Sequence, residues 1–109
     1  MKSSAERRAL SRQARDAFPP MGIYLMRDTV TGQVLVASSP NVPGAINRAV
    51  FELRRGAHAN KVLQAAWDQG GPERVTFETV ELLKERDTPD FDYGAELRML
   101  EQLYREELA

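Results

Sequence analysis

The chain has 109 residues, a formal net charge of -1 and 42% hydrophobic residues, which is enough apolar material for one domain with its own core. It has no cysteine and one histidine, so a disulfide framework, a thiolate metal site and a site built from several imidazoles are excluded. The sequence has neither an apolar run long enough to cross a bilayer nor the hydrophobic segment of a secretory signal, and we expect a cytoplasmic protein with no membrane partner.

Charge is distributed unevenly along the chain. Residues 1–60 contain nine Lys/Arg and four acids, a net +5, whereas residues 61–109 contain six Lys/Arg and twelve acids, a net -6. A basic half is typical of a surface that attracts phosphate backbones. Pairing of the two halves within one domain explains the same pattern equally well.

The first predicted element is a helix over residues 3–18, which opens on a capping box. Its apolar stripe is thin, so we expect a loosely docked arm. Four basic residues are spread around it: Arg7, Arg8, Arg12 and Arg15. Pro19 and Pro20 end the helix, because proline cannot continue one. The sequence therefore predicts a helical arm and proline linker over residues 1–20, followed by a domain over residues 21–109.

A predicted β-hairpin over residues 21–39 organises the domain. Strands over residues 23–26 and 34–37 are rich in large and β-branched side chains, and the polar segment between them ends in Gly32, which can take a positive φ. Tyr24 follows the glycine that opens the first strand.

The rest of the domain is predicted to form two helices, a strand and a last helix. The two helices are predicted over residues 43–55 and 60–69, with Gly56 ending the first and an asparagine as N-cap of the second. A third strand is predicted over residues 75–83 and the last helix over residues 94–108, after a charged loop.

The last predicted helix carries a carboxylate on its apolar face. Leu97, Leu100, Tyr104 and Leu108 form a stripe, and Glu101 falls at its centre. Burying an unpaired carboxylate costs on the order of several kcal/mol, so we expect it to be paired, hydrogen-bonded or bound to a cation. A partner arginine on a preceding helix, or a carboxylate that reaches the edge of the core, is the structural alternative to a metal ligand.

Three stretches of the chain together resemble the GIY-YIG nuclease family, in its branch of intron-encoded and phage-type endonucleases. They are Gly22-Ile23-Tyr24, the segment over residues 31–41, and the ordered pattern Leu-Arg-x-Gly-x-His-x-Asn-x-x-Leu-Gln-x-x-Trp over residues 53–67. The resemblance implies an α/β fold with a small three-stranded antiparallel sheet flanked by helices, to which the N-terminal helical arm is an addition.

The activity that the resemblance implies is metal-dependent phosphodiester hydrolysis of DNA, with Mg²⁺ or Mn²⁺ as cofactor. In the family, a first tyrosine positions or deprotonates the attacking water and a second tyrosine assists. An arginine stabilises the phosphate, and a glutamate on the last helix holds the cation. These roles suit the chemistry, because a hard cation takes oxygen ligands and a guanidinium stays charged beside a phosphate.

Residue by residue, the match to the family is incomplete. Tyr24 corresponds to the first tyrosine and Glu101 to the metal-binding glutamate, whereas residues 35–37, Leu-Val-Ala, replace Tyr-Ile-Gly and remove the second phenol. The family's arginine position falls on Ala45. Arg48, one turn further along nearly the same helix face, is the candidate for the phosphate contact.

The remaining candidates support the site or contact DNA. His58 and Asn60 match a Gly-x-His-x-Asn turn, and we interpret the histidine as orienting the start of the following helix rather than as a base. Six arginines are candidates for phosphate contacts: Arg7, Arg8, Arg12, Arg15, Arg54 and Arg55. Each candidate has a structural alternative, since Tyr24 and Arg48 also fit a half-buried strand residue and a solvated helix residue, respectively.

These departures leave three functions open. We expect a nucleic-acid-binding protein with an incomplete catalytic set that is weakly active or inactive, because a single electrostatic donor is worth about 10² to 10³ in rate. A fully active, divergent Mg²⁺-dependent endonuclease and a catalytically dead protein-interaction module are the alternatives.

Overall fold

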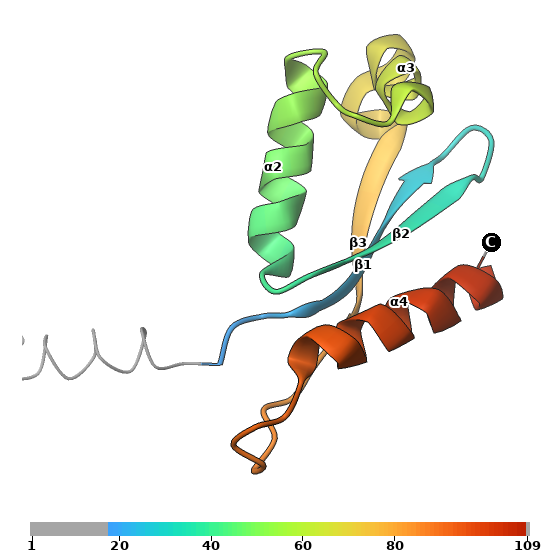
Figure 1. The fold of residues 1–109 in the computed structure, drawn as a ribbon. Helices are drawn as coiled ribbons and strands as arrows, with labels where there is room; N and C mark the ends of the chain where they lie inside the picture. Colours follow the sequence, from blue (N-terminus) through green and yellow to red (C-terminus); the bar gives the residue numbers. More distant parts are fainter. Residues whose placement is uncertain (1–17, 109) are drawn as a thin grey trace, which may run out of the picture.

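The computed structural model describes residues 18–108, so the predicted arm and its four arginines lie outside the described residues. The elements are β1 (Gly22–Asp28), β2 (Val34–Ser39), α2 (Val42–Arg54), α3 (Lys61–Gly70), the 3-10 turn η1 (Gly71–Glu73), β3 (Val75–Leu82) and α4 (Tyr93–Leu108) (Figure 1). The strands and helices predicted over this part of the chain are confirmed, and their ends differ from the predictions by at most two residues.

The three strands form one antiparallel sheet in the order β2-β1-β3, which confirms the predicted fold class. The central strand β1 is buried along nearly its whole length, because helices cover both faces of the sheet (Figure 1). Tyr24 lies opposite Ala37 of β2 and Thr79 of β3. Because strand residues alternate between faces, neighbouring residues of β1 pack against opposite helical layers.

Two apolar clusters lie on opposite faces of the sheet. On one face, α2 and α3 pack against the strands through Tyr24, Met26, Val42, Leu53, Leu63, Ala66 and Val75. On the other face, α4 packs through Leu97 against Met21, Ile23 and Val36. The hairpin and the last helix therefore belong to a three-layer arrangement, with the sheet in the middle (Figure 1).

Side chains cap the two helices of the first layer. The Asn41 side chain accepts a hydrogen bond from the Gly44 amide at 3.2 Å, so α2 begins one residue earlier than the sequence predicts. The Asn60 side chain accepts one from the Leu63 amide at 3.0 Å and caps α3, as predicted. Gly56 has φ 71° just after α2, the conformation for which glycine is favoured.

The start of β1 approaches β3 too closely for any side chain. A Cβ on Gly22 would lie 1.9 Å from the backbone oxygen of Glu81. The register then shifts between Ile23 and Tyr24, since Ile23 pairs with Glu81 but Tyr24 pairs with Thr79. This bulge turns the Glu81 carboxylate toward α4, where the Tyr104 hydroxyl donates a hydrogen bond to it at 2.7 Å.

The apolar stripe predicted for α4 is confirmed at three positions and wrong at the fourth. Leu97 is buried, and Leu100 and Tyr104 are half-buried against the same cluster. Leu108 is 41% exposed, because the apolar contacts of α4 with the cluster end at Tyr104.

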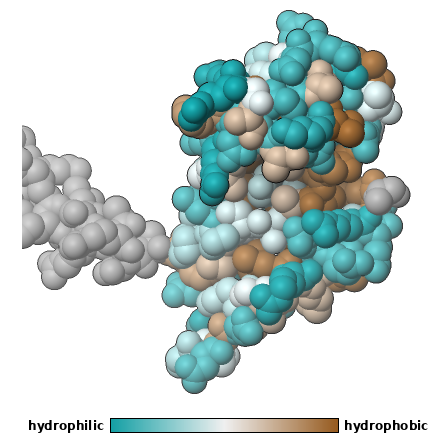
Figure 2. All heavy atoms as spheres, turned by 45° about the horizontal axis from the view of Figure 1, so that its top comes forward, coloured by the Kyte–Doolittle hydropathy of each residue, from teal (hydrophilic) through white to brown (hydrophobic). Residues whose placement is uncertain are grey.

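The face seen in Figure 2 is mostly hydrophilic and is broken by several hydrophobic areas. The large apolar residues that stay exposed are Val30, Phe51, Val62, Leu82, Met99, Leu103 and Leu108. No helix within residues 18–108 is both long and apolar enough to span a bilayer.

Candidate active site

Tyr24 lies on the sheet face that α2 and α3 cover, and its side chain is almost fully buried. Burial raises the pKa of this phenol above its usual value, and the nearby carboxylates of Glu101 and Glu52 raise it further. The phenol is therefore protonated at neutral pH and able to donate a hydrogen bond. Glu101 belongs to α4 and Glu52 to α2, so the charges that act on this phenol come from two different helices.

A cleft of about 400 Å³ opens beside Tyr24. Its walls come from β1, the end of β2, α2 and the turn after α2: Tyr24, Ser39, Asn41, Gly44, Ala45, Arg48, Ala49, Glu52 and His58. Three residues singled out by the sequence, Tyr24, Arg48 and His58, thus line one cleft. Ala45, to which the sequence resemblance assigns the family's arginine position, is another residue of the cleft wall.

Arg48 reaches the cleft from α2 and pairs with a carboxylate of the same helix. Its Nε donates to Glu52 Oε1 at 2.9 Å, and the two side chains are 82% and 30% exposed. A guanidinium has five N–H donors, so one bond to Glu52 leaves both terminal nitrogens available at the mouth of the cleft. The i,i+4 spacing holds the pair along the helix face.

His58 is fixed by hydrogen bonds at the turn between α2 and α3. Its Nδ1 accepts from the Asn60 amide at 3.1 Å, and its own amide donates to the Gln64 side chain at 3.0 Å. Because Nδ1 is an acceptor in this geometry, the proton of the neutral ring is on Nε2. The ring therefore contacts the backbone that leads into α3, and it also forms part of the cleft wall.

Glu101 extends from α4 and is half-buried, with 21% of its side chain exposed. Its partner is Arg105 of the same helix, at 3.4 Å, rather than an arginine of a preceding helix. Arg105 also donates to the backbone oxygen of Val36 at 3.4 Å. This arginine thus links the Glu101 carboxylate to the edge strand β2.

The donors near Tyr24 fit a cation held mainly by water and phosphate oxygens. Within residues 18–108, no group of three or more His, Cys, Asp or Glu side chains is placed to hold a metal ion. A single carboxylate such as that of Glu101 is nevertheless a suitable ligand for Mg²⁺, which keeps several waters and uses one or two carboxylates together with substrate phosphates. The residues present therefore suit a hard divalent cation better than a soft one.

The predicted DNA-contacting arginines within the described residues lie at the end of α2. Arg54 and Arg55 are both exposed, and the Arg55 guanidinium lies over the Phe51 ring, 5.2 Å from its centroid. The four arginines of the predicted arm lie outside the described residues, so their position relative to the cleft stays a prediction.

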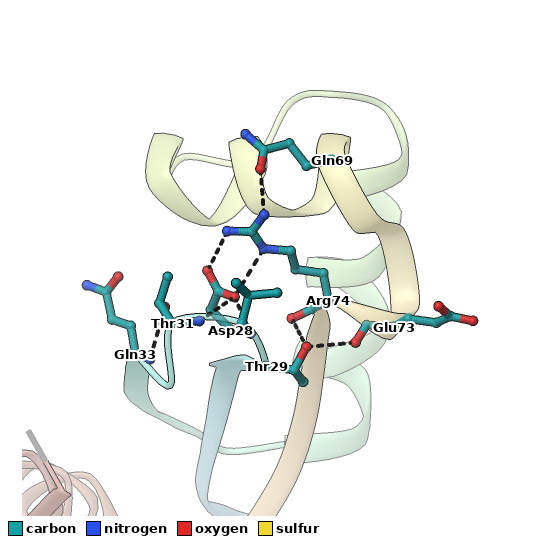
Figure 3. A network of polar contacts seen from close by, with 8 residues as sticks. Asp28, Thr29, Thr31, Gln33, Gln69, Glu73 and Arg74 are labelled. Atoms are coloured by element: carbon teal, nitrogen blue, oxygen red, sulfur yellow. Dashed lines mark hydrogen bonds and ion pairs between the residues drawn. The ribbon is translucent and has the colours of Figure 1, made fainter.

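Two ion pairs include charged residues that are not among the candidates predicted from the sequence. Glu52 was not singled out, although its spacing of four from Arg48 is a signal for an ion pair on one helix face. Asp28 and Arg74 form a second pair, with Arg74 Nε and Nη2 donating to the two Asp28 oxygens at 3.1 and 3.2 Å (Figure 3). The two residues are far apart in the chain, so no local pattern predicts this pair.

The Asp28–Arg74 pair joins the hairpin turn to the start of β3. Asp28 also accepts from the amides of Val30 and Thr31, at 2.9 and 3.3 Å, and Arg74 also donates to the Gln69 side chain (Figure 3). The hydrogen bonds from Arg74, followed by those from the turn, hold the pKa of Asp28 well below its usual value. This cluster stabilises the hairpin end opposite Gly22.

A scan against models of protein families and a search of curated proteins found no match. Among solved structures, the chain is similar to a mutant of the catalytic domain of intron endonuclease I-TevI, with a TM-score of 0.65 and 19% identity over 81% of this chain and 82% of that chain. It is also similar to the catalytic domain of homing endonuclease I-TevI, with a TM-score of 0.65 and 22% identity over 81% of this chain and 87% of that chain. At this identity the likeness is one of fold. The chain has the fold of the I-TevI catalytic domain, a GIY-YIG homing endonuclease.

Proposed function

We propose that this chain is a DNA-binding protein on a GIY-YIG endonuclease fold, whose incomplete catalytic set supports at most slow, metal-dependent hydrolysis of a phosphodiester bond. The observation that carries the proposal is the cleft lined by Tyr24, Arg48 and His58. Glu101 is not among the residues that line this cleft, but its charge contributes to the raised pKa of the Tyr24 phenol. A cleft that combines a phenol, an available guanidinium and a nearby carboxylate suits a phosphate group and a hard cation.

Each residue has a role that its surroundings favour. Arg48 contacts the phosphate through its terminal nitrogens while Glu52 holds its Nε. Tyr24, which is protonated at neutral pH, positions the attacking water by hydrogen bonding rather than as a phenolate base. Glu101 is the ligand for Mg²⁺ or Mn²⁺, which would supply Lewis-acid stabilisation of the phosphate.

Slow hydrolysis follows from what the cleft lacks. Leu35 stands where the family has its second tyrosine, and Ala45 where it has its arginine. Losing one preorganised donor typically costs about 10² to 10³ in rate. We therefore expect phosphate binding to be better preserved than phosphodiester hydrolysis. Arg54, Arg55 and the predicted arm over residues 1–20, with Arg7, Arg8, Arg12 and Arg15, extend the phosphate-binding surface beyond the cleft.

The test combines cleavage and binding on the same DNA. Purified protein is incubated with supercoiled and linear DNA in Mg²⁺ or Mn²⁺, beside Glu101→Gln, Tyr24→Phe and Arg48→Ala. We expect slow nicking that falls by about 10²-fold or more in each variant, while Glu101→Gln and Tyr24→Phe retain salt-sensitive DNA binding. Arg98→Ala, which removes an exposed arginine of α4, is the matched control and leaves both readouts unchanged.

Two outcomes contradict the proposal in different ways. Nicking that persists unchanged in both Glu101→Gln and Tyr24→Phe shows that the assigned cleft is not the reacting site. Absence of any salt-sensitive DNA binding rules out the DNA partner and leaves a protein-interaction function.

A further inference from the structure

Phe51 is an exposed aromatic residue on α2, with 58% of its surface accessible to water. It is the one aromatic side chain among the large apolar residues exposed within residues 18–108. Its described partner is a cation, since the Arg55 guanidinium lies over the ring. An exposed ring that packs against an arginine presents two flat surfaces, one aromatic and one guanidinium, at the same place.

The position of Phe51 on α2 places it beside the cleft. Gly44, Arg48, Phe51 and Arg55 are spaced i, i+4, i+7 and i+11, so they share one stripe of the helix surface. Gly44 and Arg48 line the cleft, and Phe51 lies roughly 4.5 Å further along the helix axis than Arg48. The stripe therefore runs from the cleft wall to the Phe51–Arg55 pair without interruption.

The charge around Phe51 separates it from the other exposed apolar residues. Arg48, Arg54 and Arg55 flank it in sequence and are all exposed, and the one acid among them, Glu52, is paired with Arg48. Met99 and Leu103, by contrast, lie on α4, which has four acids and two arginines, so its net charge of -2 disfavours a phosphate backbone. Single exposed apolar residues need no explanation in general, but an aromatic ring within a basic stripe matches the arrangement that binds nucleic-acid bases.

We propose that Phe51 and Arg55 stack on an unpaired nucleobase next to the phosphate that Arg48 contacts, so that the preferred substrate is DNA with a single-stranded region rather than a continuous duplex. Within a duplex, each base face is covered by its neighbours in the stack, so a side chain reaches a face only where a base is unpaired, at an end or extruded. The proposal rests on the proposed function, because it takes the cleft as the phosphate site.

The experiment measures binding without cleavage, in chelator and at a fixed salt concentration. Two DNAs share one sequence: a continuous duplex, and the same duplex with a short single-stranded gap that carries 2-aminopurine. We expect the wild-type chain to bind the gapped DNA more tightly and to quench the fluorescence of the unpaired 2-aminopurine. Phe51→Ala should weaken binding to the gapped DNA by roughly 5- to 150-fold, the range that base–aromatic stacking supports, and abolish the quenching.

Three further variants identify the contact as stacking. Phe51→Leu keeps an apolar side chain but removes the ring, and it should behave as Phe51→Ala does, whereas Phe51→Trp should retain tight binding. Arg55→Lys keeps the charge without the planar guanidinium and should lose part of the preference for gapped DNA. Met99→Ala removes an exposed apolar side chain of α4 and should change nothing.

The results that overturn this inference differ from those that overturn the proposed function. Equal affinity of the wild type for the two DNAs, or wild-type affinity of Phe51→Leu for the gapped DNA, rules out stacking and leaves the DNA-binding function standing. Equal losses on both DNAs in Phe51→Ala show a general contact, which also rules it out. Absence of salt-sensitive binding to either DNA removes both proposals.

Discussion

Asp28 is the carboxylate that the fold surrounds most completely with hydrogen-bond donors. It is buried and receives bonds from the Arg74 guanidinium and from the amides of Val30 and Thr31. Since these donors favour the ionised form, they hold its pKa below the usual value of an aspartate. The ionised Asp28 carboxylate therefore stabilises the folded end of the hairpin.

The Asp28–Arg74 pair predicts a pH dependence of stability. A carboxylate with a lowered pKa in the folded state stabilises the fold above its unfolded pKa of about 4. That contribution is lost as the pH falls through the lower, folded value. We expect the melting temperature of the wild type to fall more steeply below pH ~4 than that of Asp28→Asn, which is less stable at neutral pH.

Thermal unfolding between neutral and acidic pH measures this effect. The control is a double-mutant cycle with Arg74→Met, in which the two single changes should be strongly non-additive at neutral pH. If the melting temperatures of the wild type and Asp28→Asn change equally with pH from neutral to acidic conditions, another group accounts for the acid sensitivity.

At the scale of single residues, sequence patterns predicted candidates but not their partners. A tyrosine after a strand-opening glycine and a glutamate centred on an apolar stripe were visible because both are local patterns. Glu52 beside Arg48, and Arg74 beside Asp28, were not singled out. An ion pair depends on which long side chains meet in space, and for Asp28 and Arg74 that is decided only when β1 and β3 pair.

Strand β1 is the element on which both layers depend, and its first residue sets its contact with β3. Gly22 has no space for a Cβ because the backbone oxygen of Glu81 occupies that position. Ile23 packs toward α4 and Tyr24 toward α2, because neighbouring residues of a strand face opposite sides of the sheet. The close approach at Gly22 and the register shift beside Tyr24 therefore both belong to the contact between the start of β1 and β3.

Gly22→Ala should therefore be far more damaging than Gly32→Ala. A methyl group at Gly22 meets backbone atoms that cannot rotate away, so we expect a loss above the roughly 1–3 kcal/mol typical of overpacking. Gly32 has φ 77° but open space around it, so Gly32→Ala should cost only about 1–2 kcal/mol of conformational strain. Urea unfolding of both variants makes the comparison, and equal losses would show that β1 and β3 separate at Gly22 at little cost.

At the scale of elements, local sequence signals predict where a helix begins or ends. The Asn60 cap and the glycine after α2 act through neighbouring backbone groups, which is why the sequence alone located them. The bulge between Ile23 and Tyr24 arises from pairing with a strand some fifty residues away, and Leu108 is exposed because the cluster under α4 ends one turn earlier. No local sequence pattern predicts the bulge or the exposure of Leu108.

Residues 18–108 form two helical layers that share one three-stranded sheet. Arg48 and His58 come from the α2 and α3 layer, whereas Glu101 comes from α4 on the other side (Figure 1). Helix α4 has one fully buried residue, Leu97, with Leu100 and Tyr104 half-buried beside it, while α2 and α3 have three fully buried residues each, among them the polar Gln64. The proposed cation ligand Glu101 therefore lies on a helix with a single fully buried side chain.

Native-state hydrogen exchange should show this inequality directly. We expect the amides of α4 to exchange through a local opening with a lower free energy than those of β1. Leu97→Ala, which removes an anchor worth about 2–5 kcal/mol, should speed exchange in α4 before it affects β1. Identical opening free energies for the two elements would mean that the chain unfolds as a single unit.

If Glu101 holds the cation, as proposed above, docking of α4 and cation binding are linked equilibria. If Glu101 meets the cleft only when α4 is docked, the apparent dissociation constant for a divalent cation equals the intrinsic constant divided by the docked fraction. A change at Leu97, which contacts no ligand, then weakens cation binding in proportion to the population it undocks. Conversely, a bound cation and phosphate would stabilise the docked state by mass action, so substrate binding would protect the amides of α4 from exchange.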